Sequence, residues 1–222
     1  MPDDSQKLSV IITGATGMVG EGALLECLDH PAVERVLLVS RRPYGITHPK
    51  VKECLIPDFA KPEGHDGELS GYNACFFCAG VSSVGMSEAD YTRITYDTTI
   101  AFAEKLVSLN PQMTFIYVSG TGTDSTEKSS IMWARVKGRT ENALTRIGFK
   151  SAYNFRPGFM KPTSGQHNVK WFYGLFYWPL RLIVPSRIST MRQVGLAMIK
   201  AAAQGYPTQV LEVKDINSLG SS

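Results

Sequence analysis

The chain has little excess charge of either sign. Its 222 residues carry 23 lysines and arginines against 20 aspartates and glutamates, which gives a net charge of +3. A block of about five or six like charges, which is typical of an arm that binds nucleic acid, does not occur in the sequence. We therefore expect no nucleic acid among the partners of this protein.

Cysteine and histidine are also scarce. The four cysteines are scattered through apolar segments, which is typical of reduced, buried thiols. Cys75 and Cys78 have the spacing of a redox pair, but the run "ACFFCAG" indicates a buried strand, on which residues three apart point to opposite faces. No metal-ligand spacing links the four histidines, which are His30, His48, His65 and His167. The sequence therefore predicts neither a redox pair nor a metal site.

Targeting and membrane-spanning signals are weak. The N-terminal "MPDDSQK" lacks the basic and apolar regions of a secretory signal, so we expect a cytoplasmic protein. The apolar stretch from Trp171 to Val184 is shorter than the roughly 20 residues of a spanning helix, and Pro179 and Arg181 interrupt it, so stable membrane insertion is not expected. Three interpretations of this stretch remain: core, a lid over an apolar substrate, or a surface for a membrane or a second subunit.

Short apolar runs alternate with segments of helical periodicity along the chain. Strands are expected at residues 8–14, 35–40, 51–58, 73–80, 113–120, 150–158 and 208–213, and helices at residues 18–30, 87–109, 131–147 and 191–203. Strict alternation favours parallel pairing through right-handed crossovers. We predict an α/β protein with a Rossmann doubly wound parallel sheet, as a single domain over residues 1–222. Residues 159–222 are expected to form a small C-terminal lobe, with a frayed tail "NSLGSS".

A glycine-rich turn follows the first strand. In "TGATGMVG", Gly14, Gly17 and Gly20 allow a tight turn, a close approach of a pyrophosphate and close packing of the next helix on the sheet. The free N–H groups and the positive dipole end of that helix favour phosphate binding. Because the motif lies between a strand and a helix, it predicts a dinucleotide site.

The end of the second predicted strand indicates which dinucleotide binds. An enzyme for NAD usually has an acidic residue there, to bond the ribose 2′-hydroxyl. This chain has "VSRRP" instead, and Arg41 and Arg42 can meet a 2′-phosphate. NADP(H) is therefore favoured, and NAD(H) is the less favoured alternative.

Seven segments in sequence order together resemble the short-chain dehydrogenase/reductase superfamily: "TGATGMVG", "SRR", "PDF", "FCAG", "YVSGTG", "WARVKG" and "FRPG". The resemblance covers about residues 8–203 and is nearest to the atypical NAD(P)-binding branch related to epimerases and dehydratases, with NmrA-like and Tat-interacting-protein-like members. It implies that Ser119 orients a substrate oxygen and that Lys137 holds the nicotinamide ribose. The cofactor contacts that it implies fall on Gly14, Thr16, Gly17, Met18, Val19, Gly20, Asp58, Phe59, Ala79, Gly80, Lys137, Arg156, Pro157 and Gly158.

The family's proton donor is missing from this chain. Trp133 stands where the family has a tyrosine, four residues before Lys137, and an indole N–H donates a hydrogen bond but does not exchange a proton in the useful range. Tyr96, on the preceding helix, is the best replacement candidate. An asparagine that many members use in a proton relay is also absent, and Thr95 or Asp97 stands nearby.

Three functions remain compatible with this pattern. The first is an NADP-dependent oxidoreductase or epimerase for a small-molecule carbonyl or hydroxyl substrate, with Ser119, Lys137, Trp133 and Tyr96 or water as the catalytic groups and the aromatic stretch lining the substrate pocket. The second is a non-catalytic NADP(H) sensor that acts through a protein partner. The third is a peripheral membrane protein. A homodimer through the two long helices is compatible with each of them.

Overall fold

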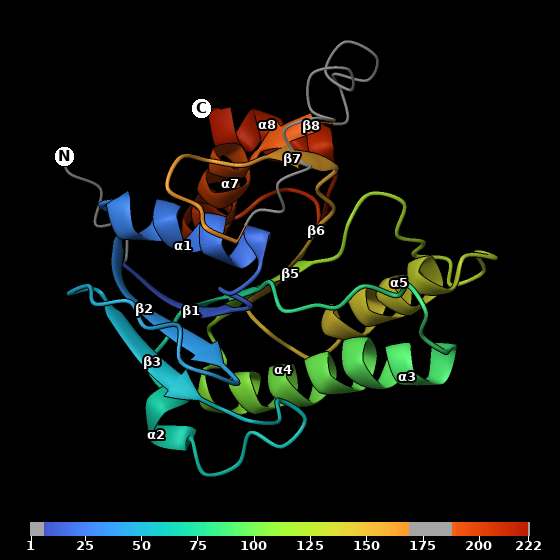
Figure 1. The fold of residues 1–222 in the computed structure, drawn as a ribbon, viewed down its shortest axis with the longest axis horizontal. Coiled ribbons are helices and arrows are strands. Elements are labelled where there is room, and N and C mark those ends of the chain that lie inside the picture. The colour runs from blue at the N-terminus through green and yellow to red at the C-terminus, as the bar shows by residue number, and fades with distance from the viewer. Residues whose placement is uncertain (1–6, 169–187, 222) are drawn as a thin grey trace.

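A computed structural model describes residues 7–168 and 188–221 of the chain (Figure 1). A seven-stranded sheet forms its centre, with the strand order β3-β2-β1-β4-β5-β6-β9 and parallel pairing throughout. The strands are β1 (Leu8–Thr13), β2 (Val33–Ser40), β3 (Val51–Leu55), β4 (Ala74–Phe77), β5 (Thr114–Val118), β6 (Ser151–Phe155) and β9 (Val210–Leu211). The chain starts at β1, winds outward to β3 and then returns to β4, so the predicted doubly wound sheet is confirmed.

Helices cover both faces of this sheet, and Figure 1 shows α1 and α7 on one side and α4 on the other. The helical elements are α1 (Met18–Asp29), α2 (Asp66–Leu69), α3 (Glu88–Thr92), the π-helix η1 (Arg93–Asp97), α4 (Thr98–Leu109), α5 (Met132–Leu144), α7 (Met191–Gln204) and α8 (Val213–Ser221). A second, two-stranded sheet pairs β7 (Phe159–Lys161) with β8 (Ile188–Thr190).

The central strands are buried on both faces. All six residues of β1 are buried, with Val10 and Ile12 in one core cluster and Ile11 in the other. Cys75 and Cys78 divide in the same way, because Cys75 lies in the cluster of Ile11 and Cys78 packs against the cluster of Val10. The two thiols therefore point to opposite faces, as the strand periodicity predicts.

The long helix expected at residues 87–109 forms with an irregularity. A π-helical turn, η1, separates α3 from α4, and the Thr98 hydroxyl donates to the carbonyl oxygen of Arg93 within it (3.0 Å). Such a turn inserts one additional residue into a helix and changes the direction of the neighbouring side chains, and π-turns occur often at functional sites.

The predicted frayed tail is wrong. Residues 217–221 belong to α8, which packs on α7 so closely that a Cβ on Gly220 would lie 2.2 Å from the carbonyl oxygen of Gln193. The Gln193 side chain also donates to the Ser221 hydroxyl (2.9 Å). The strand expected at 208–213 is correspondingly short, because β9 ends at Leu211 and α8 begins two residues later.

The C-terminal part of the chain divides between the main layers and the second sheet. α7 contributes Met191, Val194 and Met198 to the core beside α1, and β9 extends the central sheet, whereas β7 and β8 pair apart from it. The aromatic stretch from Trp171 to Val184 lies outside the described residues. No helix within residues 7–168 and 188–221 is long and apolar enough to cross a membrane.

Candidate functional site

In the glycine turn between β1 and α1, backbone atoms pack closely against other backbone atoms. Gly14 has a φ of +70°, and a Cβ added to it would lie 2.6 Å from the backbone nitrogen of Ala79, at the end of β4. A Cβ on Gly20 would lie 2.2 Å from the carbonyl oxygen of Gly14. Neither position therefore accepts another residue without a movement of the backbone.

The first turn of α1 is open at its N-terminus. Gly17 is the N-cap residue, and no side chain caps this end of the helix. Thr16 and Gly17 are exposed and line a pocket, whereas the side chains of Met18 and Val19 pack against the core. Free N–H groups and the helix dipole favour an anion at such an end.

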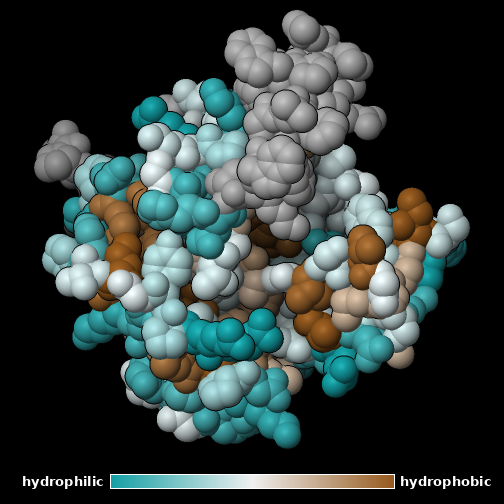
Figure 2. Space-filling model, viewed as in Figure 1, coloured by the Kyte–Doolittle hydropathy of each residue, from teal (hydrophilic) through white to brown (hydrophobic). Residues whose placement is uncertain are grey.

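This pocket has a volume of about 680 Å³, which is within the usual range for small-molecule sites. It lies at the carboxyl ends of the central strands, where ligands of doubly wound folds bind. Figure 2, which is drawn in the orientation of Figure 1, shows a hollow near the centre of the molecule. The lining comes from the glycine turn, from the ends of β2, β3 and β4, and from the π-helical turn: Gly14, Thr16, Gly17, Val39, Ser40, Arg41, Pro57, Asp58, Phe59, Ala60, Phe77, Cys78, Ala79, Gly80, Val81, Arg93, Ile94, Asp97 and Thr98.

The two arginines expected to recognise a 2′-phosphate differ in placement. Arg41 is exposed and lines the pocket, and its guanidinium has no hydrogen bond or ion pair with another described residue. Arg42 does not line the pocket. Arg93, on the π-helical turn, is a further basic residue in the lining that the sequence patterns do not indicate, and Asp90 pairs with it at 3.2 Å on the surface.

The segment after β3 contributes the pocket wall that the family resemblance implies. Asp58 and Phe59 both line the pocket, as Ala79 and Gly80 do after β4. One carboxylate oxygen of Asp58 accepts the backbone N–H of Ala60 (3.0 Å), which fixes the turn. The Phe59 ring stacks on Phe102 with centroids 5.1 Å apart, so Phe59 both lines the pocket and packs in the hydrophobic core.

The hydroxyl of Ser119, for which the resemblance implies a substrate-orienting role, is bonded to other groups of the protein. This residue is buried, and its hydroxyl donates to Glu141 on α5 at 2.5 Å, with the carbonyl oxygen of Phe155 at 3.2 Å. A carboxylate is a strong acceptor, so it holds the hydroxyl toward the interior. Ser119 is therefore part of the core polar network and does not face the pocket.

Arg156 is also turned away from the predicted cofactor contact. Its guanidinium forms ion pairs with Glu141 (2.5 Å) and Glu212 (3.0 Å) and donates to the Ser125 hydroxyl (2.5 Å). Pro157 and Gly158 follow it but do not line the pocket, and the Pro157 carbonyl accepts the N–H of Thr121 (3.1 Å). The "FRPG" segment thus stabilises the loop after β5.

Lys137 and Trp133 lie at the start of α5, where a loop packs closely on the helix. A Cβ on Gly138 would lie 1.8 Å from the carbonyl oxygen of Asp124. Hydrogen bonds from the Thr126 hydroxyl and from backbone N–H groups lower the pKa of Asp124 to about 2, so this carboxylate holds the loop. The Trp133 ring lies against Gly122 in the same loop, 3.2 Å from the position of a Cβ there.

The Lys137 ammonium donates to the backbone carbonyl of Ser119. Burial lowers the pKa of Lys137 to about 8, and the negative charge of Glu141 opposes that shift. A lysine with such a pKa exists in both protonation states near neutral pH, which is a property of general acids and bases.

Tyr96, the candidate replacement for the missing tyrosine, packs against α5. The guanidinium of Arg139 lies over its ring, 4.2 Å from the ring centroid. Tyr96 is not among the residues that line the pocket described above, whereas Arg93, Ile94 and Asp97 of the same turn are. A catalytic role for Tyr96 stays a prediction.

Glu21 is a buried carboxylate that the sequence patterns do not indicate. It is 1% exposed, and its two oxygens accept the backbone N–H groups of His167 and Asn168, each at 2.8 Å. The Gln166 side chain donates to the carbonyl oxygen of Met18 (2.7 Å). These bonds fasten residues 166–168 to the first turns of α1, which is the helix at the pocket.

Comparison with curated proteins finds relatives of moderate similarity, and no family model matches the chain. "Protein fmp52-1, mitochondrial" of Aspergillus terreus is 28% identical over 164 residues, which is 70% of this chain and 68% of that protein. "Protein FMP52, mitochondrial" of Candida glabrata is 24% identical over 208 residues, with 89% and 86% covered. These names contradict the expectation of a cytoplasmic protein, which used the N-terminal composition alone.

Solved structures share the fold over nearly the whole chain. The Bordetella bronchiseptica enzyme WbmF in complex with NAD+ has a TM-score of 0.67 at 14% identity and covers 99% of this chain and 78% of its own. The NADPH-bound carbonyl reductase from chicken fatty liver has a TM-score of 0.66 at 14% identity and covers 95% and 98%. The resemblance to short-chain dehydrogenases/reductases is thus confirmed for the fold, whose members here bind NAD+ or NADPH.

Proposed function

We propose that this chain, with its short-chain dehydrogenase/reductase fold, binds NADP(H) in the pocket at the carboxyl ends of β1 to β4. The observation that supports this most directly is the placement of Arg41. Arg41 lines the pocket together with Thr16 and Gly17 at the open N-terminus of α1, and its guanidinium has no hydrogen bond or ion pair with the residues that the structure describes. Guanidinium groups bind phosphates through charge-assisted hydrogen bonds, so Arg41 is placed to bind a 2′-phosphate.

The residues present fit such a nucleotide. Thr16 and Gly17 provide an exposed, uncapped helix start for the pyrophosphate, and the pocket volume of about 680 Å³ accepts the adenosine half. Asp58 and Phe59 supply a polar and an aromatic wall. A bound dinucleotide would supply hydride chemistry, while the chain supplies binding and orientation.

Two single variants test the nucleotide preference. Arg41→Ala removes the pocket guanidinium, whereas Arg42→Ala is a matched control because Arg42 follows it in sequence but lies outside the lining. Titration calorimetry with NADPH and NADH should show that Arg41→Ala weakens NADPH binding by about tenfold or more, or about 1.4 kcal/mol. NADH binding should change by less than about twofold, and Arg42→Ala should leave both affinities near those of the wild type.

Equal losses for NADPH and NADH in Arg41→Ala would contradict the NADP(H) assignment. A thermal shift series on the wild type tests nucleotide binding itself. A ligand at 100 times its dissociation constant stabilises a protein by about 2.7 kcal/mol. No shift with NADPH, NADP, NADH or NAD would reject the whole proposal.

We further propose that the bound nucleotide is sensed rather than turned over, with a protein partner responding to it. Three features support this role. Trp133 replaces the family's tyrosine, Ser119 donates into the core, and Tyr96 lies under Arg139. Neither Trp133 nor Ser119 thus offers a free hydroxyl to hold and protonate a substrate oxygen, and Tyr96 is not among the described residues that line the pocket.

An NADP-dependent carbonyl reductase is the second candidate, and the pKa of Lys137 favours it. A lysine with a pKa of about 8 is able to donate a proton near neutral pH. NADPH oxidation by the wild type against a broad panel of carbonyl compounds separates the two functions. Turnover that disappears in Lys137→Met while NADPH still binds would support the reductase. Binding without turnover in the wild type, together with turnover in Trp133→Tyr, would identify a reductase scaffold without its acid.

The names of the relatives also support a mitochondrial location for this protein. Fractionation of cells that express the full chain, with detection by an antibody to the chain itself, would test it. Recovery with mitochondrial markers is expected, and recovery without them would contradict the proposal.

A further inference from the structure

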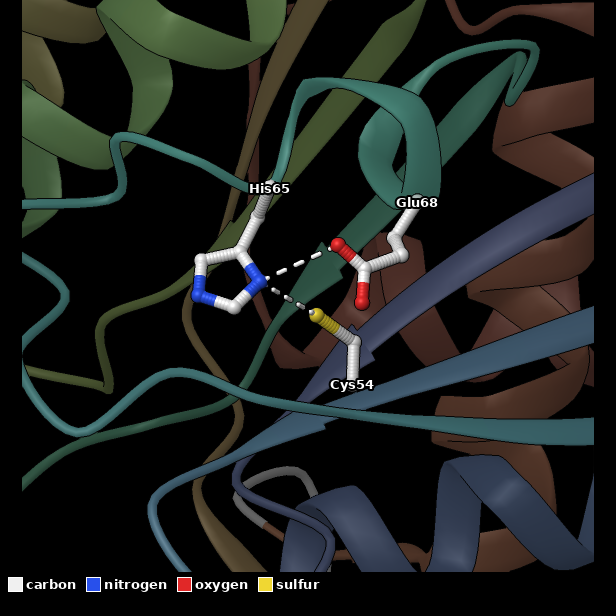
Figure 3. A group of neighbouring side chains, drawn as sticks. All are labelled: Cys54, His65 and Glu68. Carbon is white, nitrogen blue, oxygen red and sulfur yellow. Dashed lines mark hydrogen bonds and ion pairs between the residues drawn. The ribbon is translucent and has the colours of Figure 1, made fainter.

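A second group of reactive side chains lies beside the nucleotide pocket. Cys54 at the end of β3, His65 at the start of α2 and Glu68 within α2 point toward one another (Figure 3). One possible ligand atom from each residue lies within 4.8 Å of the other two. The pocket-lining residues 57–60 lie between Cys54 and His65 along the chain.

The distances in this group are those of neighbouring ligands on one metal ion. The Cys54 sulfur lies 3.6 Å from Nδ1 of His65, and that nitrogen lies 3.1 Å from Oε2 of Glu68. In a tetrahedral zinc site with Zn–S of about 2.3 Å and Zn–N and Zn–O of about 2.0–2.1 Å, the corresponding separations are roughly 3.6 Å and 3.3 Å. Two of the three separations thus match a shared ion, and the Cys54 sulfur and the Glu68 oxygen lie within 4.8 Å of each other.

Nδ1 of His65 faces the Cys54 thiol and the Glu68 carboxylate at the same time. In the metal-free protein it can donate its N–H to Glu68, with the sulfur as a weak second acceptor. A cation bound between the three atoms would replace these hydrogen bonds with metal–ligand bonds.

The chemistry of the three ligands narrows the choice of cation. A thiolate, an imidazole and a carboxylate together suit zinc, whereas calcium and magnesium prefer oxygen ligands. Zinc is therefore the cation that this set of ligand atoms fits best.

We propose that Cys54, His65 and Glu68 form a zinc site with three protein ligands. Cys54 is buried, whereas the side chains of His65 and Glu68 are 27% and 56% exposed. The site thus opens to solvent on the α2 side, which gives the ion an entry path and leaves a fourth position for water. The ion would fasten β3 to α2 across the loop that forms part of the pocket wall. This proposal does not depend on nucleotide binding.

Zinc titration of the reduced, metal-stripped full chain against a chromogenic chelator tests the site. The wild type should bind one Zn²⁺ per chain. Glu68→Gln, His65→Gln and Cys54→Ser should each weaken binding by about tenfold or more, which is about 1.4 kcal/mol. Glu63→Gln and His48→Gln are the matched controls, because Glu63 lies in the same connection and neither residue belongs to the group, and they should bind like the wild type.

Cobalt provides a second readout that identifies the sulfur ligand. The Co²⁺-loaded wild type should show a thiolate-to-cobalt charge-transfer band, and Cys54→Ser should lack it while Cys27, Cys75 and Cys78 remain. Glu68→Gln changes an exposed side chain, so its result does not depend on the integrity of the core. Absence of stoichiometric zinc binding in the wild type would overturn the proposal. Wild-type affinity in Glu68→Gln and His65→Gln would overturn it as well.

Discussion

The two halves of the predicted cofactor site use their polar groups in opposite ways. In the half formed by β1 to β4, the uncapped start of α1 and Arg41, which has no ion pair within residues 7–168 and 188–221, line a pocket. In the half formed by β5, β6 and α5, Ser119, Glu141 and Arg156 bond to one another in the interior. The polar groups of the first half are open to a ligand, whereas those of the second half already have hydrogen-bond and ion-pair partners within the protein. The proposed nucleotide pocket and the inner polar network therefore lie in different halves of the fold.

The largest effect is expected from Glu141→Ala, which removes the centre of the inner network. Glu141 is 1% exposed, and its loss would leave the Arg156 guanidinium buried beside an empty space. Removal of one partner from a buried ion pair costs about 3–5 kcal/mol of the free energy of unfolding. Urea denaturation measures it, and NADPH affinity of the folded variant should change by less than about twofold.

Glu212→Ala is the matched control, because Glu212 pairs with the same guanidinium but its side chain is 48% exposed. We expect a loss below about 1 kcal/mol for this exposed partner. Similar losses in the two variants would show that the inner network is not the stabilising element described above.

A smaller effect is expected from Gly14→Ala in the pocket half. The new Cβ would meet the main chain of Cys78 and Ala79 at a positive φ, and strain of this kind costs about 2–3 kcal/mol. Gly17→Ala is the control, because its Cβ would meet only the Gly14 carbonyl at 3.4 Å, and as an N-cap change it should cost under about 1 kcal/mol.

Nucleotide affinity separates these two glycines further. Gly17 is exposed in the pocket, so a methyl group there should weaken NADPH binding although the fold is kept. Unchanged NADPH affinity in Gly17→Ala would show that the turn is a structural feature of α1 and not a phosphate site.

The smallest effect is expected from the protonation of Lys137, which changes the free energy of unfolding as the pH changes. Its pKa is about 8 in the folded chain against 10.5 ordinarily, so the unfolded chain binds more protons between these pH values. The contribution of Lys137 to the free energy of unfolding therefore rises with pH, by about 2 kcal/mol between about pH 8 and pH 9.5. Below about pH 8 the cost of burying the charge is fully present.

Urea denaturation of the wild type and Lys137→Met across this pH range measures the difference. Other titrating groups cancel in the comparison, so the wild type should gain stability relative to the variant as pH rises. A difference that stays constant with pH would mean that Lys137 keeps its ordinary pKa.

The features that the sequence predicts well are those that depend on the requirements of the backbone. Continuous apolar runs identify β1 and β4 because parallel strands are buried on both faces, and the spacing of Gly14 and Gly20 reports contacts that only glycine allows. Such requirements belong to short segments and remain visible in one sequence. The α/β class, the doubly wound parallel sheet and the turn at α1 follow from them.

Side-chain directions are predicted poorly because distant residues determine them. The Ser119 hydroxyl bonds to Glu141, 22 positions later, and the Tyr96 ring packs against Arg139, 43 positions later. Cys54 and His65 meet across a connection of irregular length that no ligand-spacing rule covers. The α8 helix did have a signal, because Val213, Ile216 and Gly220 recur at helical spacing and are buried.

The hydrogen bonds at Glu21 and Gln166 connect α1 to residues 166–168, almost 150 positions later in the chain. Because the amides of His167 and Asn168 are protected by a carboxylate on α1, these amides exchange with solvent only when the helix releases them. Hydrogen exchange at these two amides would thus report how often residues 166–168 separate from the helix that begins at the pocket.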